Sequence, residues 1–148
     1  MSTTKVIGWG KCTATHTPSG TGATAKVYDD IVDGSTSLSV EEGQEQEALI
    51  EGGQAEARKK QPDKYIIEFE RRIGNAADVT PGFTDDAGSI EIEPELVGAI
   101  GVTLTGVSLY ISVSFDTTDG LKAHYTFKTK GATTGGALTD ITFAAKAS

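Results

Sequence analysis

The feature that most constrains the fold is a strict two-residue alternation over residues 107–115. Every odd position there is apolar, whereas the even positions hold serine or tyrosine. A period of two places successive side chains on opposite faces of a strand, so this stretch predicts a strand with one buried face. Asp119-Gly120 follows and can supply the positive φ of a tight turn. Residues 121–127 alternate again, so we expect a β-hairpin.

Shorter alternating stretches predict further strands at residues 35–42, 63–72, 89–93, 102–104 and 138–144. Residues 94–100 start with proline and precede Gly101, a pattern typical of a short α-helix. The 148 residues contain 18 glycines and no repeat or linker, and this length corresponds to about one domain. We therefore expect a single mainly β domain over residues 1–148, a β-sandwich or small barrel with one short α-helix.

The N-terminal 34 residues are the hardest part of the chain to assign. Residues 6–10 predict a further strand, and residues 13–24, rich in threonine and glycine, predict a mobile loop.

A long connection, residues 43–62, joins two of the predicted strands. A loop of this length inside a compact domain is either functional or wrongly assigned. The competing interpretation is a helix over residues 43–51, because Glu, Gln, Ala and Leu favour one. Such a helix could bury only Ala48, Leu49 and Ile50, so we prefer a long inter-strand loop.

Charge is unevenly distributed around this connection. An acidic block contains Glu41, Glu42, Glu45, Glu47 and Glu51, and a basic block contains Arg58, Lys59, Lys60 and Lys64. Two opposite patches on one loop suit a head-to-tail contact between copies of the chain. Charge balance within a single hairpin is an equally good interpretation, since surface ion pairs contribute only about 0–1 kcal/mol.

Composition argues against several functions. A net charge of -8 disfavours a nucleic-acid reader that gains affinity by neutralising phosphates. The single cysteine, Cys12, excludes an intramolecular disulfide framework. No apolar run is long enough for a membrane helix and no signal-peptide pattern follows Met1, so we expect a chain of cytosolic origin.

Candidate catalytic and metal-binding residues are few. Cys12 with His16 or His124 lacks the spacing of a known nucleophile site and is too small a set for zinc. Turn formation explains the aspartates at residues 29, 30, 33, 85 and 86 better than a calcium loop does. Glu68 and Glu70 fit a solvated strand face better than a glycosidase pair. We expect no enzymatic activity, no metal site and no cofactor.

The order of these elements resembles that of the small tail tube proteins of tailed bacteriophages and prophages, which are related to the inner-tube proteins of contractile injection systems. The resemblance spans about residues 35–127. It rests on the segment 35–43, the Glu- and Gly-rich connection, the basic residues 58–60, the strand at 64–70 and the C-terminal hairpin.

This resemblance implies a non-enzymatic structural subunit of a virion tail, assembled in the cytoplasm of the bacterial host. Copies would close into a ring, a hexamer in that family, and rings would stack into a tube that conducts DNA without sequence-specific binding. The partners would be other copies and other tail proteins, and no membrane is involved. The long loop would order on stacking. An acidic lumen would be lined by Ser37, Ser39, Glu41, Glu68 and Glu70.

Other functions fit the same pattern. A tail-terminator or head–tail connector protein would share the sandwich and the ring. A carbohydrate-binding or adhesin module would need an exposed aromatic platform, for which Trp9, Tyr28 and Tyr110 are the candidates.

Overall fold

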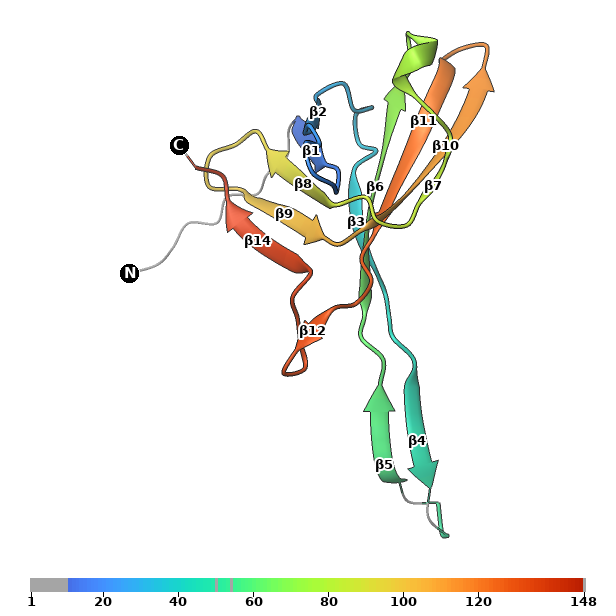
Figure 1. Ribbon diagram of the computed structural model, residues 1–148, viewed down its shortest axis with the longest axis vertical. Helices are drawn as coiled ribbons and strands as arrows, with labels where there is room; N and C mark the ends of the chain where they lie inside the picture. The colour runs from blue at the N-terminus through green and yellow to red at the C-terminus, as the bar shows by residue number, and fades with distance from the viewer. Residues whose placement is uncertain (1–10, 50, 54, 148) are drawn as a thin grey trace.

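The computed structural model describes residues 11–49, 51–53 and 55–147. These residues form two five-stranded sheets and two separate two-stranded hairpins (Figure 1). The only helical segment in the described part of the chain is a single 3-10 turn, η1 (Ala76–Asp78). The prediction of a mainly β fold is confirmed. The strand predicted at residues 6–10 lies outside the described residues.

The two large sheets each combine strands from distant parts of the sequence. We call them sheet A, in the order β14–β9–β8–β1–β2, and sheet B, in the order β3–β6–β11–β10–β7. Sheet A comprises β1 (Cys12–Thr17), β2 (Lys26–Tyr28), β8 (Ser89–Pro94), β9 (Ile100–Thr105) and β14 (Ile141–Ala145). Sheet B comprises β3 (Ser37–Glu41), β6 (Lys64–Arg72), β7 (Gly82–Thr84), β10 (Ser108–Asp116) and β11 (Gly120–Lys128). The hairpins are β4 (Glu45–Leu49) with β5 (Ala55–Lys60), and β12 (Thr133–Thr134) with β13 (Ala137–Leu138).

A single apolar core joins the two sheets in a sandwich-like arrangement. Ile90 and Leu104 of sheet A and Ile67, Phe69 and Phe127 of sheet B are completely buried in it. The predicted hairpin is confirmed, since β10 and β11 pair continuously from Ser108↔Lys128 to Asp116↔Gly120. Its odd-numbered residues face sheet A, as the alternation predicts.

A largely buried arginine, paired with a half-exposed aspartate, links the edge of sheet A to sheet B. Arg71, on β6, donates from Nε and Nη2 to the two carboxylate oxygens of Asp30 at 2.7 and 3.0 Å. Its Nη1 donates to the hydroxyl of Tyr125 at 3.0 Å, and its guanidinium lies 4.5 Å from the ring centre of Tyr28 on β2. Only 11% of the Arg71 side chain is exposed. The hydrogen bond from Arg71 lowers the pKa of Asp30.

A second polar group in the core is His16. Its Nε2 donates to the carbonyl oxygen of Ala87 at 2.6 Å, and its ring packs edge-on against Phe127. Burial lowers the pKa of His16; the bond to Ala87 opposes this effect and the charge of nearby Lys26 adds to it. The imidazole is therefore held neutral inside the sandwich.

We expect this histidine to make the fold sensitive to mild acid. Because its pKa is lower in the folded than in the unfolded chain, the unfolded chain takes up the proton first, below about pH 6.5. The free energy of unfolding should then fall by up to about 1.4 kcal/mol per pH unit, while it stays level above that pH. Urea titrations across this range measure the slope. A His16→Gln variant should lose the slope; an equal slope in the variant and the unmodified protein would contradict the prediction.

Two sequence predictions fail in sheet A. The α-helix predicted at residues 94–100 is wrong, because β8 ends at Pro94 and a turn leads directly into β9. Backbone hydrogen bonds from Gly98 to Lys146 and from Lys146 to Ala99 use groups that a helix would need, and Gly98 has a φ of 88°. The loop predicted at residues 13–24 is wrong in its first part, where β1 pairs with both β2 and β8.

Candidate interaction surface

The connection at residues 43–62 is neither a structureless loop nor a helix. Its strands β4 and β5 form a separate hairpin, the arm (residues 44–61), which projects away from the sandwich as a continuation of β3 and β6 (Figure 1). All side chains of β4 are exposed. The register of β4 with β5 continues that of β3 with β6, so strand pairing extends from the sandwich into the arm. An isolated hairpin is only marginally stable, and this continuation explains why the segment is strand and not helix.

The base of the arm is fixed to the sandwich. Gly43 lies so close to the opposite strand that a β-carbon there would be 1.8 Å from the carbonyl oxygen of Gln61. The N–H of Gly43 donates to Asp63 Oδ1 at 2.9 Å, and the N–H of Gln61 donates to the carbonyl of Gln44 at 2.7 Å. The arm therefore leaves the sheet in a defined direction.

In the strand register of the arm, positions of the acidic block lie opposite positions of the basic block. Glu45 is opposite Lys60 and Glu47 is opposite Arg58 in the register. Lys60 Nζ also lies 3.3 Å from Glu42 and 3.6 Å from Asp63. This arrangement favours charge balance within one hairpin over two separate patches. The remaining predicted loop residues are placed by the strand register. Lys59 is opposite Gln46, Lys64 is opposite Glu41, and Glu51 lies in the turn at the tip.

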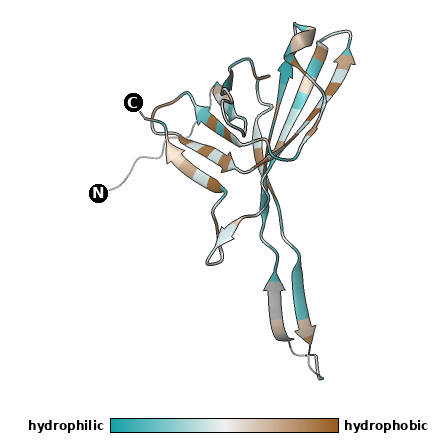
Figure 2. Ribbon diagram, in the orientation of Figure 1, coloured by the Kyte–Doolittle hydropathy of each residue, from teal (hydrophilic) through white to brown (hydrophobic). Residues whose placement is uncertain are grey.

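The side of sheet B that faces away from the core is mostly polar, and its apolar or aromatic members are Ile66, Phe83 and Tyr110. The strand registers place Ser37, Ser39, Glu68 and Glu70 together on this polar face, as the sequence predicts, and Glu41 lies on it at the end of β3. Along the strands of sheet B, hydrophilic and hydrophobic residues alternate (Figure 2). Sequence reasoning missed the other contributors, although they are the even-numbered residues of the same hairpin: Lys122, His124, Thr126, Lys128, Ser112 and Ser114.

The carboxylates of the polar face have cationic or imidazole partners. Glu70 lies 3.5 Å from Nδ1 of His124 and 3.9 Å from Lys122, and Glu68 lies 3.9 Å from Nε2 of His124. Lys128 donates to Glu41 and thereby lowers the pKa of that carboxyl group. The face is therefore hydrophilic and charge-balanced, whereas the resemblance implies a lining of serines and glutamates with an acidic character.

Both edges of sheet B are open over five residues with similar sequences. At one edge, β3 (residues 37–41, SLSVE) pairs only with β6 among the described strands. At the other edge, the short β7 covers only Leu109–Ile111 of β10, which leaves residues 112–116 (SVSFD) without a described partner on that side. On the core side of the sheet, the two edges expose Leu38 (40%), Val40 (52%), Val113 (42%) and Phe115 (73%).

The candidate catalytic residues are not brought together. Cys12 and His16 lie four residues apart on one strand, about 13 Å at the usual rise, and His124 lies on the polar face of the other sheet. Burial raises the pKa of the Cys12 thiol, which disfavours the nucleophilic thiolate. In the described residues, no group of three His, Cys, Asp or Glu side chains could hold a metal ion.

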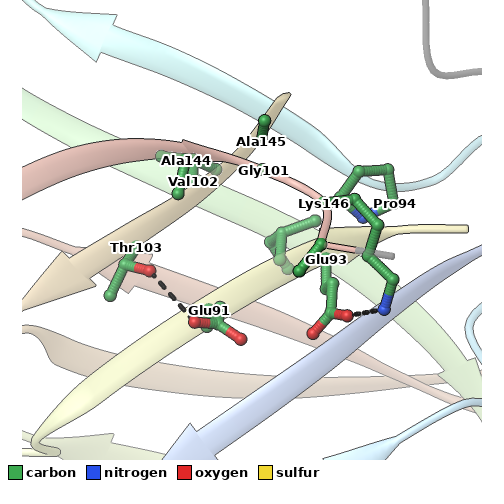
Figure 3. A pocket seen from close by; sticks show the side chains of 11 residues that line it. Glu91, Glu93, Pro94, Gly101, Val102, Thr103, Ala144, Ala145 and Lys146 are labelled. Atoms are coloured by element: carbon green, nitrogen blue, oxygen red, sulfur yellow. Dashed lines mark hydrogen bonds and ion pairs between the residues drawn. The ribbon is translucent and has the colours of Figure 1, made fainter. Parts of the chain in front are cut away.

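A pocket of about 190 Å³ lies over β8, β9 and β14 on the outside of sheet A (Figure 3). Thr103 Oγ1 donates to Glu91 at 3.4 Å, and Lys146 pairs with Glu93. Pockets for small ligands usually measure about 300–1,000 Å³, so this one is small for such a site, and its charged groups are paired with each other.

Tyr28 and Tyr110, the two described candidates for the aromatic platform of a carbohydrate-binding module, are not brought together. Tyr28 is half-buried beneath Arg71 in sheet A, whereas Tyr110 is exposed on the polar face of sheet B. Trp9 lies outside the described residues.

No protein-family model matches the chain, and no curated protein is significantly similar to it. Among the described residues, no helix is long and apolar enough to cross a membrane.

Proposed function

We propose that this protein is a structural subunit of a bacteriophage or prophage tail tube: copies join edge to edge into rings, and rings stack into a tube that conducts DNA. The observation that carries the proposal is the match between the two open edges of sheet B. If β3 of one copy lies against residues 112–116 of the next, Leu38 meets Phe115, Ser39 meets Ser114 and Val40 meets Val113. Apolar side chains then join on the core side and serines join on the polar face.

Strand direction supports this pairing. Each pairing within sheet B is antiparallel, so β3 and β10, three positions apart, run in opposite directions. A rotation about a ring axis preserves strand direction relative to that axis. The β3 strand of one copy therefore meets β10 of its neighbour in the antiparallel sense, and the ring closes as a continuous antiparallel sheet.

The offset of the pairing also fits a ring. Within one copy, Ser37 is level with Tyr110 through Glu68 and Thr126, whereas the proposed pairing puts Ser37 against Asp116, six residues further along β10. Each copy contributes the four strands β3, β6, β11 and β10 to the ring. If these strands lie about 4.8 Å apart and are tilted by about 45° from the ring axis, the register shifts along the strand direction by about 19 Å per copy, or roughly six residues. Closed sheets normally have tilts of about this size.

In such a ring the polar face would line the lumen. Its serines, threonine and mutually paired charges give a wetted wall, and a chain with a net charge of -8 disfavours retention of phosphates. The arm would extend beyond the end of the sheet toward the next ring. We propose that it supplies the contact between rings.

Charged substitutions at the β10 edge test the edge pairing. In a Val113→Glu/Phe115→Glu variant, two carboxylates would be buried between copies, so we expect it to remain monomeric at concentrations where the unmodified protein forms rings. Native mass spectrometry across a concentration series and electron microscopy report the two states. Val27→Glu is the matched control, because Val27 is 61% exposed on the edge strand β2 of sheet A.

Cysteine pairs test the register. With Cys12 changed to serine, a Ser39→Cys/Ser114→Cys variant should form covalent multimers on oxidation, because directly opposite residues have β-carbons about 4.5–5.5 Å apart. A Ser39→Cys/Ser108→Cys variant, out of register, should not. A protein that stays monomeric at every concentration, or assembly of the edge variant at the unmodified level, would refute the proposal.

A further inference from the structure

Sheet A has an apolar surface that the core does not cover. Ile100 is opposite Ala145 in the register, and Phe143 is opposite Val102. Ile100 and Val102 share one face of β9 with the buried Leu104, so Ile100 and Phe143 lie on the core-facing side of sheet A. Ile100 is 62% exposed and Phe143 is 61% exposed. Leu96 and Val97 of the preceding turn are also exposed, 45% and 56%, and we call these four residues together the β9–β14 overhang.

The proposed edge pairing alone buries too little apolar surface for a stable interface between copies. The four apolar side chains at the two edges offer on the order of 400 Å² of exposed surface, whereas a stable interface buries about 1,600 Å² in total. A ring needs additional apolar contact between copies. The β9–β14 overhang is one of the largest remaining groups of exposed apolar side chains in the described chain, and contiguous apolar surfaces of this kind mark interaction sites.

The position of the overhang points to the same neighbour. In the view of Figure 1, β9 and β14 extend past β3, on the side of sheet B opposite to β10. A neighbour that pairs its residues 112–116 with this β3 places Val113 and Phe115 on the core side of the joined sheet. These side chains then lie on the side of sheet B over which the β9–β14 overhang extends.

We infer that the β9–β14 overhang is a docking surface for a second copy of this chain, whose Val113 and Phe115 pack against Ile100 and Phe143. This inference rests on the proposed function and adds a second contact to it. Each copy contributes the overhang to one neighbour and the β10 edge to the other, so the contact is head-to-tail and can close a ring. The apolar core of each sandwich then continues into that of the next copy.

The test is an Ile100→Glu/Phe143→Glu variant, compared with Val113→Glu/Phe115→Glu and with Val27→Glu. We expect the overhang variant to associate at least tenfold more weakly than the unmodified protein, measured by sedimentation and native mass spectrometry, while Val27→Glu associates normally. Circular dichroism checks that each monomer is folded; if the glutamates prevent folding, threonine at both positions replaces them.

A double-mutant cycle makes the test specific. Phe115→Ala and Phe143→Ala should be non-additive in their effect on association, because each removes the same contact. Additive effects, or an overhang variant that associates like the unmodified protein, would overturn the inference. If the β10 edge variant is monomeric in the same series, the proposed function survives that result. If neither variant changes association, the proposed function fails as well.

Discussion

Replacing Arg71 by alanine is expected to lower the free energy of unfolding by about 3 kcal/mol, the largest effect we expect for a single substitution within one copy. The change removes the two hydrogen bonds to Asp30, the bond to the Tyr125 hydroxyl and the stacking on Tyr28. It also leaves the Tyr125 hydroxyl without this donor in a nearly closed core. Urea or thermal unfolding of the monomer measures the loss.

Milder variants separate the components of this link. Tyr125→Phe removes one hydrogen bond and should cost about 1 kcal/mol. Arg71→Lys keeps the charge but loses the bidentate geometry, so its stability should fall between those of the alanine variant and the unmodified protein. If the alanine variant were as stable as Tyr125→Phe, the contact with Asp30 would contribute nothing.

The same ion pair has a defined pH dependence. Because Arg71 lowers the pKa of Asp30, the carboxylate stabilises the fold above the ordinary aspartate pKa of about 3.9. That contribution should disappear as the pH falls through the lowered value. Asp30→Asn should abolish this acid-side slope and leave the slope due to His16 near pH 6 intact.

The sequence predicts those strands of the sandwich that have a clear two-residue alternation, because this alternation reflects burial directly. The hairpin of β10 and β11 and the strands β3, β6, β8 and β9 all lie where the two-residue period places them. The turn at residues 95–99 is mispredicted because its backbone pairs with the end of β14, about fifty residues away in the sequence. Such long-range pairing overrides local helix propensity.

The candidate interaction surface is only partly readable from the sequence. Alternation alone places Ser37, Ser39, Glu68 and Glu70 on solvated faces. The strand order β3–β6–β11–β10 joins these faces into one surface. The same order brings Lys122 and His124 next to the glutamates of that surface. The similarity between residues 37–41 and 112–116 is visible in the sequence. This similarity indicates a pairing between copies only once both segments are known to be sheet edges.

Removing the arm is expected to separate ring formation from stacking. The variant replaces residues 45–60 by Asn-Gly, a two-residue turn that joins strand ends already linked by the hydrogen bond from Gln61 to Gln44. The core contains no residue of β4 or β5, so the free energy of unfolding should change by less than about 1 kcal/mol. Both edges of sheet B remain, and rings should form at the same concentration as those of the unmodified protein.

Stacking of those rings should be reduced at least a hundredfold, because the proposed contact between rings is lost while the contact within rings is kept. Electron microscopy counts rings against tubes, and sedimentation measures the concentration at which tubes appear. A Glu47→Arg/Arg58→Glu variant is the matched control, since it exchanges the charges of one cross-strand pair, keeps the hairpin and leaves Lys60 beside Glu42 and Asp63. Tubes of normal length from the arm-deleted protein would show that stacking uses another surface, while leaving the edge pairing of the ring untouched.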